Sequence, residues 1–289
     1  FFFANMAEPV AVELQKEKKE KKSKKSKDDV GDDGDLPADM RVRVAVRIRP
    51  FNKADHNDTS ICLTVDDNKI TADNGQKNAS FSYDHVFFES QQADVYKAVG
   101  ETMLHDAFSG FNSTIFAYGQ TGSGKTYSMV GVENDPVHEG LLPRICKDLF
   151  ALGEELMAED RTLNIKIQVS FVEVYNEKIH DLLQFEVPGV VRGTEEDMKE
   201  LKLKENKKTK CFDVEGLSLH TVTNYPRVKN LIEIGTEYRT KAATGMNELS
   251  SRSHSVFTIF MNQTHQPPSP TQRDMCSKIV IVDLAGSER

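Results

Sequence analysis

The sequence predicts an α/β fold, in which strands and helices alternate along one large domain. The chain has 289 residues, of which 38% are hydrophobic, and this is enough for a substantial core. β-branched runs alternate with amphipathic segments, as in sheets that are covered by helices. The apolar run at residues 114–118 leads directly into the glycine-rich GQTGSGKT at residues 119–126. This order is typical of a strand that ends in a functional loop.

The first elements follow from local patterns. Residues 41–49, RVRVAVRIR, alternate between Arg or Ala and an aliphatic residue, which predicts a strand with one buried face. Further strands are predicted at ICLTV and at ASFSYDHVF. Ser90 is expected to cap a helix over QQADVYKAVGETMLHDAF, because serine side chains bond the free N–H groups of a first turn. The strand STIFAY should lead into the glycine-rich loop.

The second half continues the alternation. A helix is predicted at LLPRICKDLFALGEELM, followed by the long strand NIKIQVSFVEVY and a short helix at NEKIHDLL. Residues 184–210 are polar and charged and are interpreted as an inserted loop. The segment PRVKNLIEIGTEYRTKAA predicts a helix, with Pro226 at its start and Gly245 just past its end. Two strands are expected at HSVFTIFMNQT and CSKIVIVDL.

Composition limits the classes of function. The net charge of −8 argues against a nucleic-acid binder that works by charge. No apolar run approaches the ~20 residues that span a bilayer. The four cysteines lie far apart without a CxxC pair, and they are interpreted as reduced, buried thiols of a cytosolic protein. They are Cys62, Cys146, Cys211 and Cys276.

A charged segment precedes the predicted domain. Residues 16–27, KEKKEKKSKKSK, are followed by the acidic DDVGDDGD, and such blocks cannot bury apolar surface. We therefore expect a disordered tail over residues 1–39 and a folded domain over residues 40–289. A solvated tail is the simpler interpretation. A contact with an acidic partner and a nuclear-import signal remain alternatives.

The glycine-rich loop has the spacing of a phosphate-binding P-loop, with Gly119 followed after four residues by Gly124, Lys125 and Thr126. Glycines let backbone N–H groups turn toward a nearby ligand, because no Cβ is in the way. In such loops the amides hold phosphates, the lysine reaches the β- and γ-phosphates, and the hydroxyl holds Mg²⁺. A flexible Gly/Ser linker is the alternative, which the predicted strand–loop–helix order disfavours.

Two other polar segments belong with a P-loop. The β-branched run KIVIVDLAGSE ends in Asp283, and an acidic residue at this place in P-loop enzymes holds the Mg²⁺ shell. Gly286 offers a backbone N–H for a γ-phosphate. The segment NELSSRSH, residues 247–254, clusters hydroxyls before a strand. A hydrophilic loop with a helix cap is its simpler interpretation.

A GTPase is one P-loop class with these features, because DLAG matches the Asp-x-x-Gly switch. NKAD at residues 52–55 also matches the guanine-reading Asn-Lys-x-Asp. Guanine readers place that motif after the switch, whereas here it precedes the P-loop. We therefore interpret NKAD as a coincidence.

The chain resembles the kinesin motor domain more closely. GQTGSGKT, NELSSRSH and DLAGSE are similar to the kinesin P-loop, switch I and switch II, in the kinesin order. RIRP and EVYNEKIHDLL resemble two further kinesin motifs. The match covers residues 41–289 and extends to N-terminal-motor kinesins, with kinesin-3 the most similar group. It implies an arrowhead α/β fold, with a sheet of about eight mostly parallel strands and helices on both faces, and a C-terminal part missing after switch II.

The resemblance also implies the residues of a nucleotide site. Arg47, Pro50 and Tyr127 would flank the adenine. The phosphates would be held by Gly119, Gln120, Thr121, Gly122, Ser123, Gly124, Lys125 and Thr126. Thr126 and Ser251 would ligate Mg²⁺, with Asp283 in its second shell.

The implied catalytic residues come from the P-loop and from both switches. They are Lys125, Asn247, Ser250, Ser251, Arg252, Gly286 and Glu288. Arg252 and Glu288 would pair across the switches, and Glu288 would accept the proton of the attacking water through a second water. Gly286 would sense the γ-phosphate, so that its release reorders the loop.

The implied activity is ATP hydrolysis that microtubules stimulate, with ATP and Mg²⁺ bound and a place on the cytoplasmic microtubule cytoskeleton. A nucleotide-binding but inactive fragment or adaptor is the alternative. The lysines of residues 199–210 either meet acidic tubulin or serve as solvated charge. Because the main track contacts of the family would follow Arg289, this chain alone is expected to bind microtubules weakly.

Overall fold

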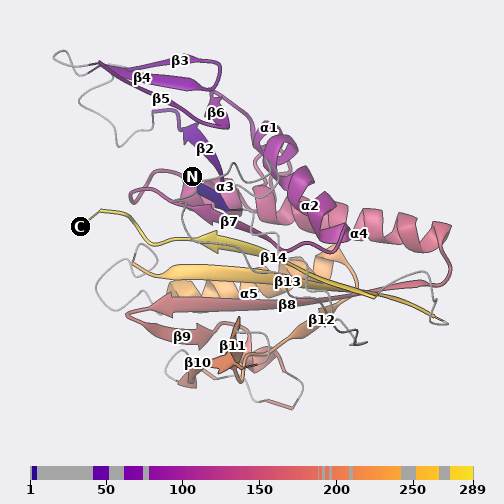
Figure 1. Cartoon of the computed structure of the whole chain (residues 1–289). Coiled ribbons are helices and arrows are strands. Elements are labelled where there is room, and N and C mark those ends of the chain that lie inside the picture. The colour runs from indigo at the N-terminus through magenta and orange to yellow at the C-terminus, as the bar shows by residue number, and fades with distance from the viewer. Residues whose placement is uncertain are drawn as a thin grey trace, which may run out of the picture.

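A computed structural model describes residues 2–4, 42–51, 62–73, 78–187, 189–190, 193–194, 197–207, 211–241, 252–266 and 274–288. Most strands of this part of the chain belong to one large mixed sheet of 11 strands (Figure 1). The strand order is β11-β10-β9-β8-β13-β14-β7-β1-β2-β6, and β12 pairs with β8. A second sheet of three strands, β3-β4-β5, lies beyond β6. The α/β fold predicted from the sequence is confirmed.

The strands of the large sheet come from both halves of the chain. They are β1 (Phe2–Ala4), β2 (Arg43–Ile48), β6 (His85–Phe88), β7 (Ser113–Ala117), β8 (Leu163–Tyr175), β9 (Lys178–Asp181), β10 (Glu200–Asn206), β11 (Cys211–Glu215), β12 (His220–Val222), β13 (His254–His265) and β14 (Met275–Asp283). The small sheet holds β3 (Leu63–Asp66), β4 (Lys69–Asp73) and β5 (Asn78–Ser82).

The strand directions correct the expectation of a mostly parallel sheet of about eight strands. Only β14 with β7 and β2 with β6 run parallel within the described sheet. The other pairs are antiparallel because several neighbours in space are also neighbours in sequence. β8 and β9 form one hairpin and β10 and β11 another, and only an antiparallel pair can be joined by a tight turn.

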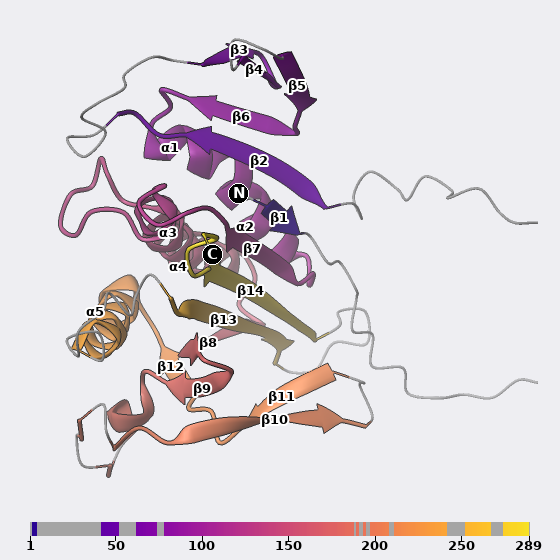
Figure 2. The same cartoon turned by 90° about the vertical axis from the view of Figure 1, so that its left-hand side faces the viewer.

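The helices are α1 (Gln92–Val95), the π-helical η2 (Tyr96–Gly100), α2 (Glu101–Phe108), α3 (Lys125–Met129), α4 (Leu141–Glu159), the 3₁₀ turn η3 (Gln184–Glu186) and α5 (Tyr225–Lys241). α4 packs against α2, α3 and α5, so these helices form one layer (Figure 2). In the part of the chain that the structure describes, this layer covers one face of the sheet, which corrects the expectation of helices on both faces. None of the described helices is long and apolar enough to cross a bilayer.

The burial of β13 shows the same one-sided packing. Phe257, Ile259 and Met261 alternate with less buried neighbours, as expected when only one face meets a core. Phe171 of β8 packs edge-on against Phe257, with ring centroids 5.4 Å apart. Gly235 of α5 lies so close to the Phe171 ring that a Cβ at this position would overlap it. A glycine therefore lets α5 sit directly on the sheet.

Three local predictions are wrong. Ser90 does not cap the helix that follows it, because its hydroxyl donates to the Phe88 carbonyl. The N-cap is Gln91, whose backbone N–H donates to the Asp94 carboxylate at 2.8 Å, and α1 begins at Gln92. NEKIHDLL forms the turn and strand of a hairpin, because Asn176 and Glu177 both take positive φ angles, of 50° and 63°. Such angles at two central residues give the turn that matches the twist of paired strands.

The third concerns residues 184–210, of which residues 200–206 form the strand β10, paired with β9 and β11, rather than a loop. In β10, Lys202 and Lys204 alternate with Leu201 and Leu203 and both lysines are exposed, so the backbone can pair while the charged groups stay in water. Pro226 does lie at the start of α5, as predicted. Gly245 lies outside the described residues.

The structure partly corrects the expectations about the N-terminal tail and about the cysteines. Residues 2–4, which fall within the predicted tail, form β1, and this strand pairs antiparallel with both β7 and β2. The other positions of residues 1–39 lie outside the described residues, and the domain boundary at residue 40 stays a prediction. Among the cysteines, Cys146 is buried as expected, whereas Cys62 and Cys276 are exposed. Cys276 lies on an outward position of β14, and the side chain of Cys211 is outside the description.

Candidate active site

The glycine-rich loop connects β7 to α3, in the predicted strand–loop–helix order. Gly122 and Gly124 take φ angles of 78° and 93°, in the left-handed region that side chains disfavour. A Cβ on Gly119 would lie 2.5 Å from the Ser123 hydroxyl. The loop therefore keeps its shape only with glycine at these places, and α3 begins directly after it at Lys125.

Lys125 is held inside this loop. Its ammonium donates to the carbonyls of Gly119 and Gln120, at 2.9 and 3.0 Å. The side chain is 8% exposed, which is unusual for a lysine. Two of its three N–H donors are thus used by the loop itself, and one cation is fixed at the centre of the glycine turn.

The C-terminal end of β14 meets the start of α3. The Thr126 hydroxyl donates to Asp283 Oδ2 at 2.6 Å, and this bond joins residues that are 157 positions apart. The parallel pairing of β14 with β7 causes the meeting, because it sets Asp283 beside Ala117, two residues before the loop. The second oxygen of Asp283, Oδ1, is buried without a hydrogen-bond partner among the described residues.

The segment after β14 returns to the glycine-rich loop. The Ser287 N–H donates to the Gly119 carbonyl at 3.1 Å. The Glu288 carboxylate accepts from the backbone N–H of Thr121 at 2.9 Å and, through a short contact, from the Thr121 hydroxyl. These bonds, that from the hydroxyl first, lower the pKa of Glu288 to about 2. A Cβ on Gly286 would strike the Glu288 carboxylate, so this fold of the loop needs glycine there.

A cation and an aromatic ring lie on the other side of α3. The guanidinium carbon of Arg47 lies 5.2 Å from the centroid of the Tyr127 ring, in the range of a cation–π contact. Burial lowers the pKa of Arg47, although arginine remains charged at any neutral pH. Tyr127 is 36% exposed, so one part of the ring is open to a ligand. Pro50 is exposed, and its carbonyl accepts from Arg49 at 3.0 Å.

These features fit a nucleoside triphosphate with a divalent cation. The loop offers backbone N–H groups and a buried cation, as phosphates require. Thr126 and Asp283 offer hard oxygen ligands, which Mg²⁺ prefers, and Asp283 Oδ1 and Ser123 Oγ are buried polar atoms without partners among the described residues. The open face of Tyr127 suits a planar base.

Comparison with known proteins decides the family. The family model described as the kinesin motor domain matches residues 47–289. The chain belongs to the kinesin motor family.

Individual kinesins agree with this assignment. The chain is 40% identical over 261 residues to the kinesin-like protein unc-104 of Caenorhabditis elegans, covering 86% of this chain and 16% of that protein. It is also 40% identical over 272 residues to the human kinesin-like protein KIF13B, covering 87% of this chain and 14% of that protein. The chain therefore spans about a sixth of these relatives, which support the resemblance to kinesin-3 motors.

A solved structure, "Structure of a fast kinesin: Implications for ATPase mechanism and interactions with microtubules", has the same fold as this chain. The TM-score is 0.74 at 32% identity, over 86% of this chain and 66% of that one. The predicted fold of a P-loop kinesin motor is confirmed.

The structure of this chain brings together most of the predicted site residues that it describes. The P-loop residues, Asp283, Gly286 and Glu288 meet at the end of β7, and Arg47 meets Tyr127 on the far side of α3. Asn247, Ser250 and Ser251 lie outside the described residues, so their places at the γ-phosphate and the metal stay predictions.

One predicted contact is not formed. The resemblance predicts a pair of Arg252 with Glu288, yet among the described residues no ion pair joins them, and Glu288 instead bonds Thr121. Arg252 is exposed in the turn before β13. The two neighbouring segments meet through His254, whose Nδ1 accepts from the Ala285 N–H at 3.0 Å. The backbone of switch II thus already contacts the last residue of switch I in this arrangement.

Sequence reasoning missed a buried charge network behind the P-loop of this kinesin. Arg239 of α5 lies 3.6 Å from Asp283 Oδ2 and 3.7 Å from Glu173 Oε1, and all three side chains are nearly enclosed. Arg239 also donates to the hydroxyls of Ser253 and Ser255, at 3.3 and 3.2 Å. One cation therefore serves two buried carboxylates and the start of β13. No pattern in the sequence around Arg239 indicates that it meets these residues.

Removing this cation should destabilise the fold strongly. In Arg239→Met, Glu173 and Asp283 would be left buried without a counter-ion, and breaking a buried pair costs about 3–5 kcal/mol. The free energy of unfolding from urea titration measures the loss. The double variant Arg239→Met with Glu173→Gln should recover part of it, since one of the two charges is gone. A single variant within about 0.5 kcal/mol of the parent would contradict this role.

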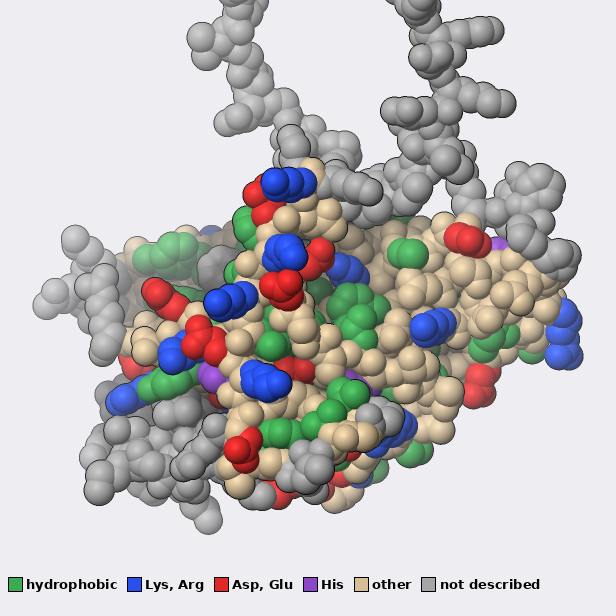
Figure 3. All heavy atoms as spheres, turned by 90° about the horizontal axis from the view of Figure 1, so that it is seen from below, with side chains coloured by type: hydrophobic (Ala, Val, Ile, Leu, Met, Phe, Trp, Pro, Cys, Tyr) green, Lys and Arg blue, Asp and Glu red, His purple; other side chains and the backbone are tan. Residues whose placement is uncertain are grey.

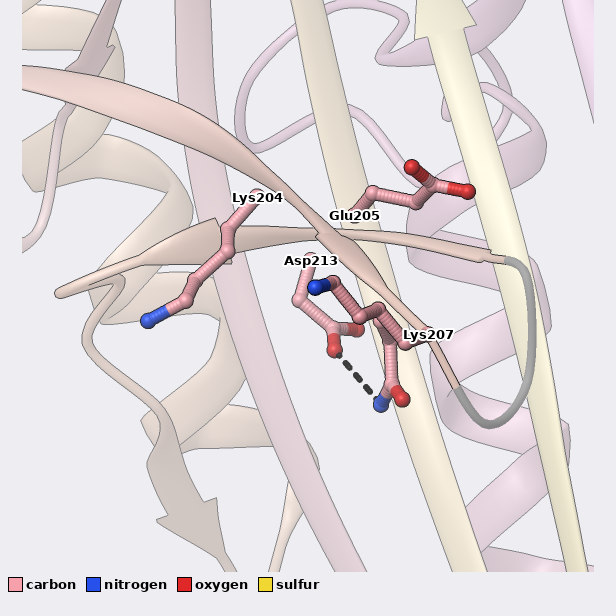
Figure 4. A pocket seen from close by; sticks show the side chains of 5 residues that line it. Lys204, Glu205, Lys207 and Asp213 are labelled. Atoms are coloured by element: carbon pink, nitrogen blue, oxygen red, sulfur yellow. Dashed lines mark hydrogen bonds between the residues drawn. The ribbon is translucent and has the colours of Figure 1, made fainter.

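A separate hollow of about 340 Å³ lies on the β10–β11 hairpin (Figure 4). It is lined by Lys204, Glu205, Asn206, Lys207 and Asp213, and none of these is a predicted site residue. Asn206 donates to Asp213 at 3.2 Å inside it. This charged surface hollow is therefore not part of the candidate site.

Proposed function

We propose that this kinesin chain binds Mg-ATP at the P-loop and hydrolyses it, and that the full-length protein uses the reaction for movement along microtubules. The observation that carries the proposal is the bond from Thr126 to Asp283. It brings the loop that suits a phosphate chain to the strand end that suits a metal shell.

The roles of the residues are those that the resemblance to kinesins implies. The amides of residues 119–126 and the Lys125 ammonium would hold the phosphates. Thr126 and Ser251 would hold Mg²⁺, with Asp283 in its second shell. Mg²⁺ would neutralise charge on the phosphate oxygens. Arg47, Pro50 and Tyr127 flank the base, whose identity an aromatic stack tolerates well.

The switch residues carry the hydrolysis itself. Asn247, Ser250 and Ser251 would surround the γ-phosphate, and the Gly286 N–H would sense its presence. Glu288 accepts the proton of the attacking water through a second water. The structure holds Glu288 on Thr121, so the pair with Arg252 that the resemblance predicts would require Glu288 to leave Thr121.

The proposed partner is the microtubule, and the proposed location is the cytoplasmic cytoskeleton. The lysines of β9 and β10 give this partner little support, because glutamates of neighbouring strands pair with two of them. Lys204 pairs with Glu215 at 3.1 Å and Lys178 with Glu200 at 3.4 Å. Figure 3 shows charges of both signs mixed on the face of the molecule that it views. Solvated charge is the better interpretation of the described hairpin lysines.

The experiment that tests the proposal measures ATP turnover by the full-length protein with and without microtubules. A motor should hydrolyse ATP slowly alone and much faster with microtubules. Nucleotide binding without stimulated turnover would instead favour an adaptor. Omission of Mg²⁺ serves as the control, and it should abolish turnover in both conditions.

A further inference from the structure

Gln92 connects the two residues proposed to flank the base. It is the first residue of α1 and is 3% exposed, so its carboxamide lies inside the protein. Its oxygen accepts from Arg47 Nη1 at 2.6 Å. Its nitrogen donates to the backbone carbonyl of Tyr127 at 2.6 Å and to that of His138 at 3.2 Å. One buried side chain thus holds β2, α3 and the loop before α4 together.

The carboxamide is well suited to this task. An amide offers an acceptor and two N–H donors in one plane, and here a guanidinium and two carbonyls use all three. The N–H of the preceding residue, Gln91, is fixed by Asp94 at 2.8 Å, which sets where α1 begins and so where Gln92 stands. Neither a carboxylate nor an aliphatic side chain makes the same set of bonds.

The arrangement controls the geometry between Arg47 and Tyr127. Nη1 of Arg47 is shared by Gln92 and the buried Ser128 hydroxyl, at 2.6 and 2.9 Å, and Nη2 reaches the Ser90 carbonyl at 3.4 Å. The guanidinium therefore has a fixed position over the Tyr127 ring. The peptide that carries this ring is held by the same carboxamide.

We propose that Gln92 is the positioning residue of the base subsite: it fixes Arg47 and Tyr127 as one preformed surface that binds the nucleobase. This inference rests on the proposed function. Gln92 does not touch the phosphate loop, whose lysine is held by Gly119 and Gln120. It follows that Gln92 contributes to binding of the base and not to binding of the phosphates.

Two variants and two ligands separate these contributions. Gln92→Leu removes all three bonds, and Gln92→Glu keeps an acceptor for Arg47 while losing the donors to Tyr127 and His138. Calorimetry measures the affinity of each variant for Mg-ATP and for Mg-tripolyphosphate, which has the phosphates but no base. Thermal unfolding without ligand shows whether each variant is folded at the assay temperature.

Both variants should bind Mg-ATP about tenfold more weakly or worse, because Gln92→Leu loses the bond to the charged guanidinium and Gln92→Glu loses both bonds to the carbonyls of Tyr127 and His138. Both should bind Mg-tripolyphosphate as the parent does. Equal losses for both ligands, or no loss of Mg-ATP affinity in a folded variant, would overturn the role of Gln92. If the unchanged chain binds neither ligand, the proposed function itself fails. The parent measurement therefore distinguishes the two failures.

Discussion

Replacing Lys125 by alanine is expected to weaken Mg-ATP binding by about 100-fold or more. The buried ammonium is the cation that the P-loop sets beside the phosphates, and bonds between charged groups contribute about 1.5–3 kcal/mol each. The same change frees the carbonyls of Gly119 and Gln120, so the loop also loses the group that fixes its shape. Calorimetry with Mg-ATP measures the effect.

Lys202→Ala is the matched control, because that lysine lies exposed on β10 and away from the loop. It removes the same charge from the chain and should leave the affinity unchanged. Equal affinity of Lys125→Ala and the parent chain would refute the assignment of the P-loop.

Glu288→Ala should retain Mg-ATP binding in the full-length protein and slow its hydrolysis about 10²–10⁴-fold, the usual contribution of a general base. Single-turnover hydrolysis separates this step from binding and product release. A rate near that of the parent protein would mean that Glu288 accepts no proton in the reaction.

Thr121→Val tests the arrangement in which the structure holds Glu288. The variant keeps the carboxylate and removes the hydroxyl that lowers its pKa most. The pKa should therefore rise from about 2 toward its ordinary value, and hydrolysis should persist. Since the pKa is lowered in the folded state, this bond stabilises the fold above the ordinary carboxyl pKa. That contribution is lost as the pH falls toward 2. A parent protein whose Glu288 titrates at the ordinary value in NMR would contradict the bond.

The sequence predicted those parts of the fold that local patterns determine. The P-loop, the strand before it and the strand that ends in Asp283 each carry their pattern within about ten residues. The hairpin turn at Asn176 and Glu177 was missed because neither residue is the glycine that such a turn favours. The alternation of residues 41–49 suggests that the aliphatic side is buried. Ala45 is instead the buried residue, because its side of β2, with Arg47, faces the helices.

Gln92 and Arg239 were missed for a different reason. Gln92 meets residues 35 to 46 positions away, and Arg239 of α5 meets strand residues of β8 and β14. Nothing within a short window marks a glutamine or an arginine for such contacts. Only the strand order, which places β8, β13 and β14 side by side, brings the partners of Arg239 into reach, and only the packing of α1 beside β2 and α3 does so for Gln92.

The pairing of β14 with β7 has a consequence for folding. Thr126 and Asp283 are 157 positions apart, and Thr121 and Glu288 are 167 apart, so the nucleotide site depends on contacts of very high sequence separation. Closing such long loops costs entropy before any contact repays it, and chains rich in these contacts fold slowly. The early hairpins of β8 with β9 and of β10 with β11 form without any part of the site. Nucleotide affinity should therefore appear late in refolding. Mg-ATP, which binds only the completed sheet, should stabilise the folded state by mass action.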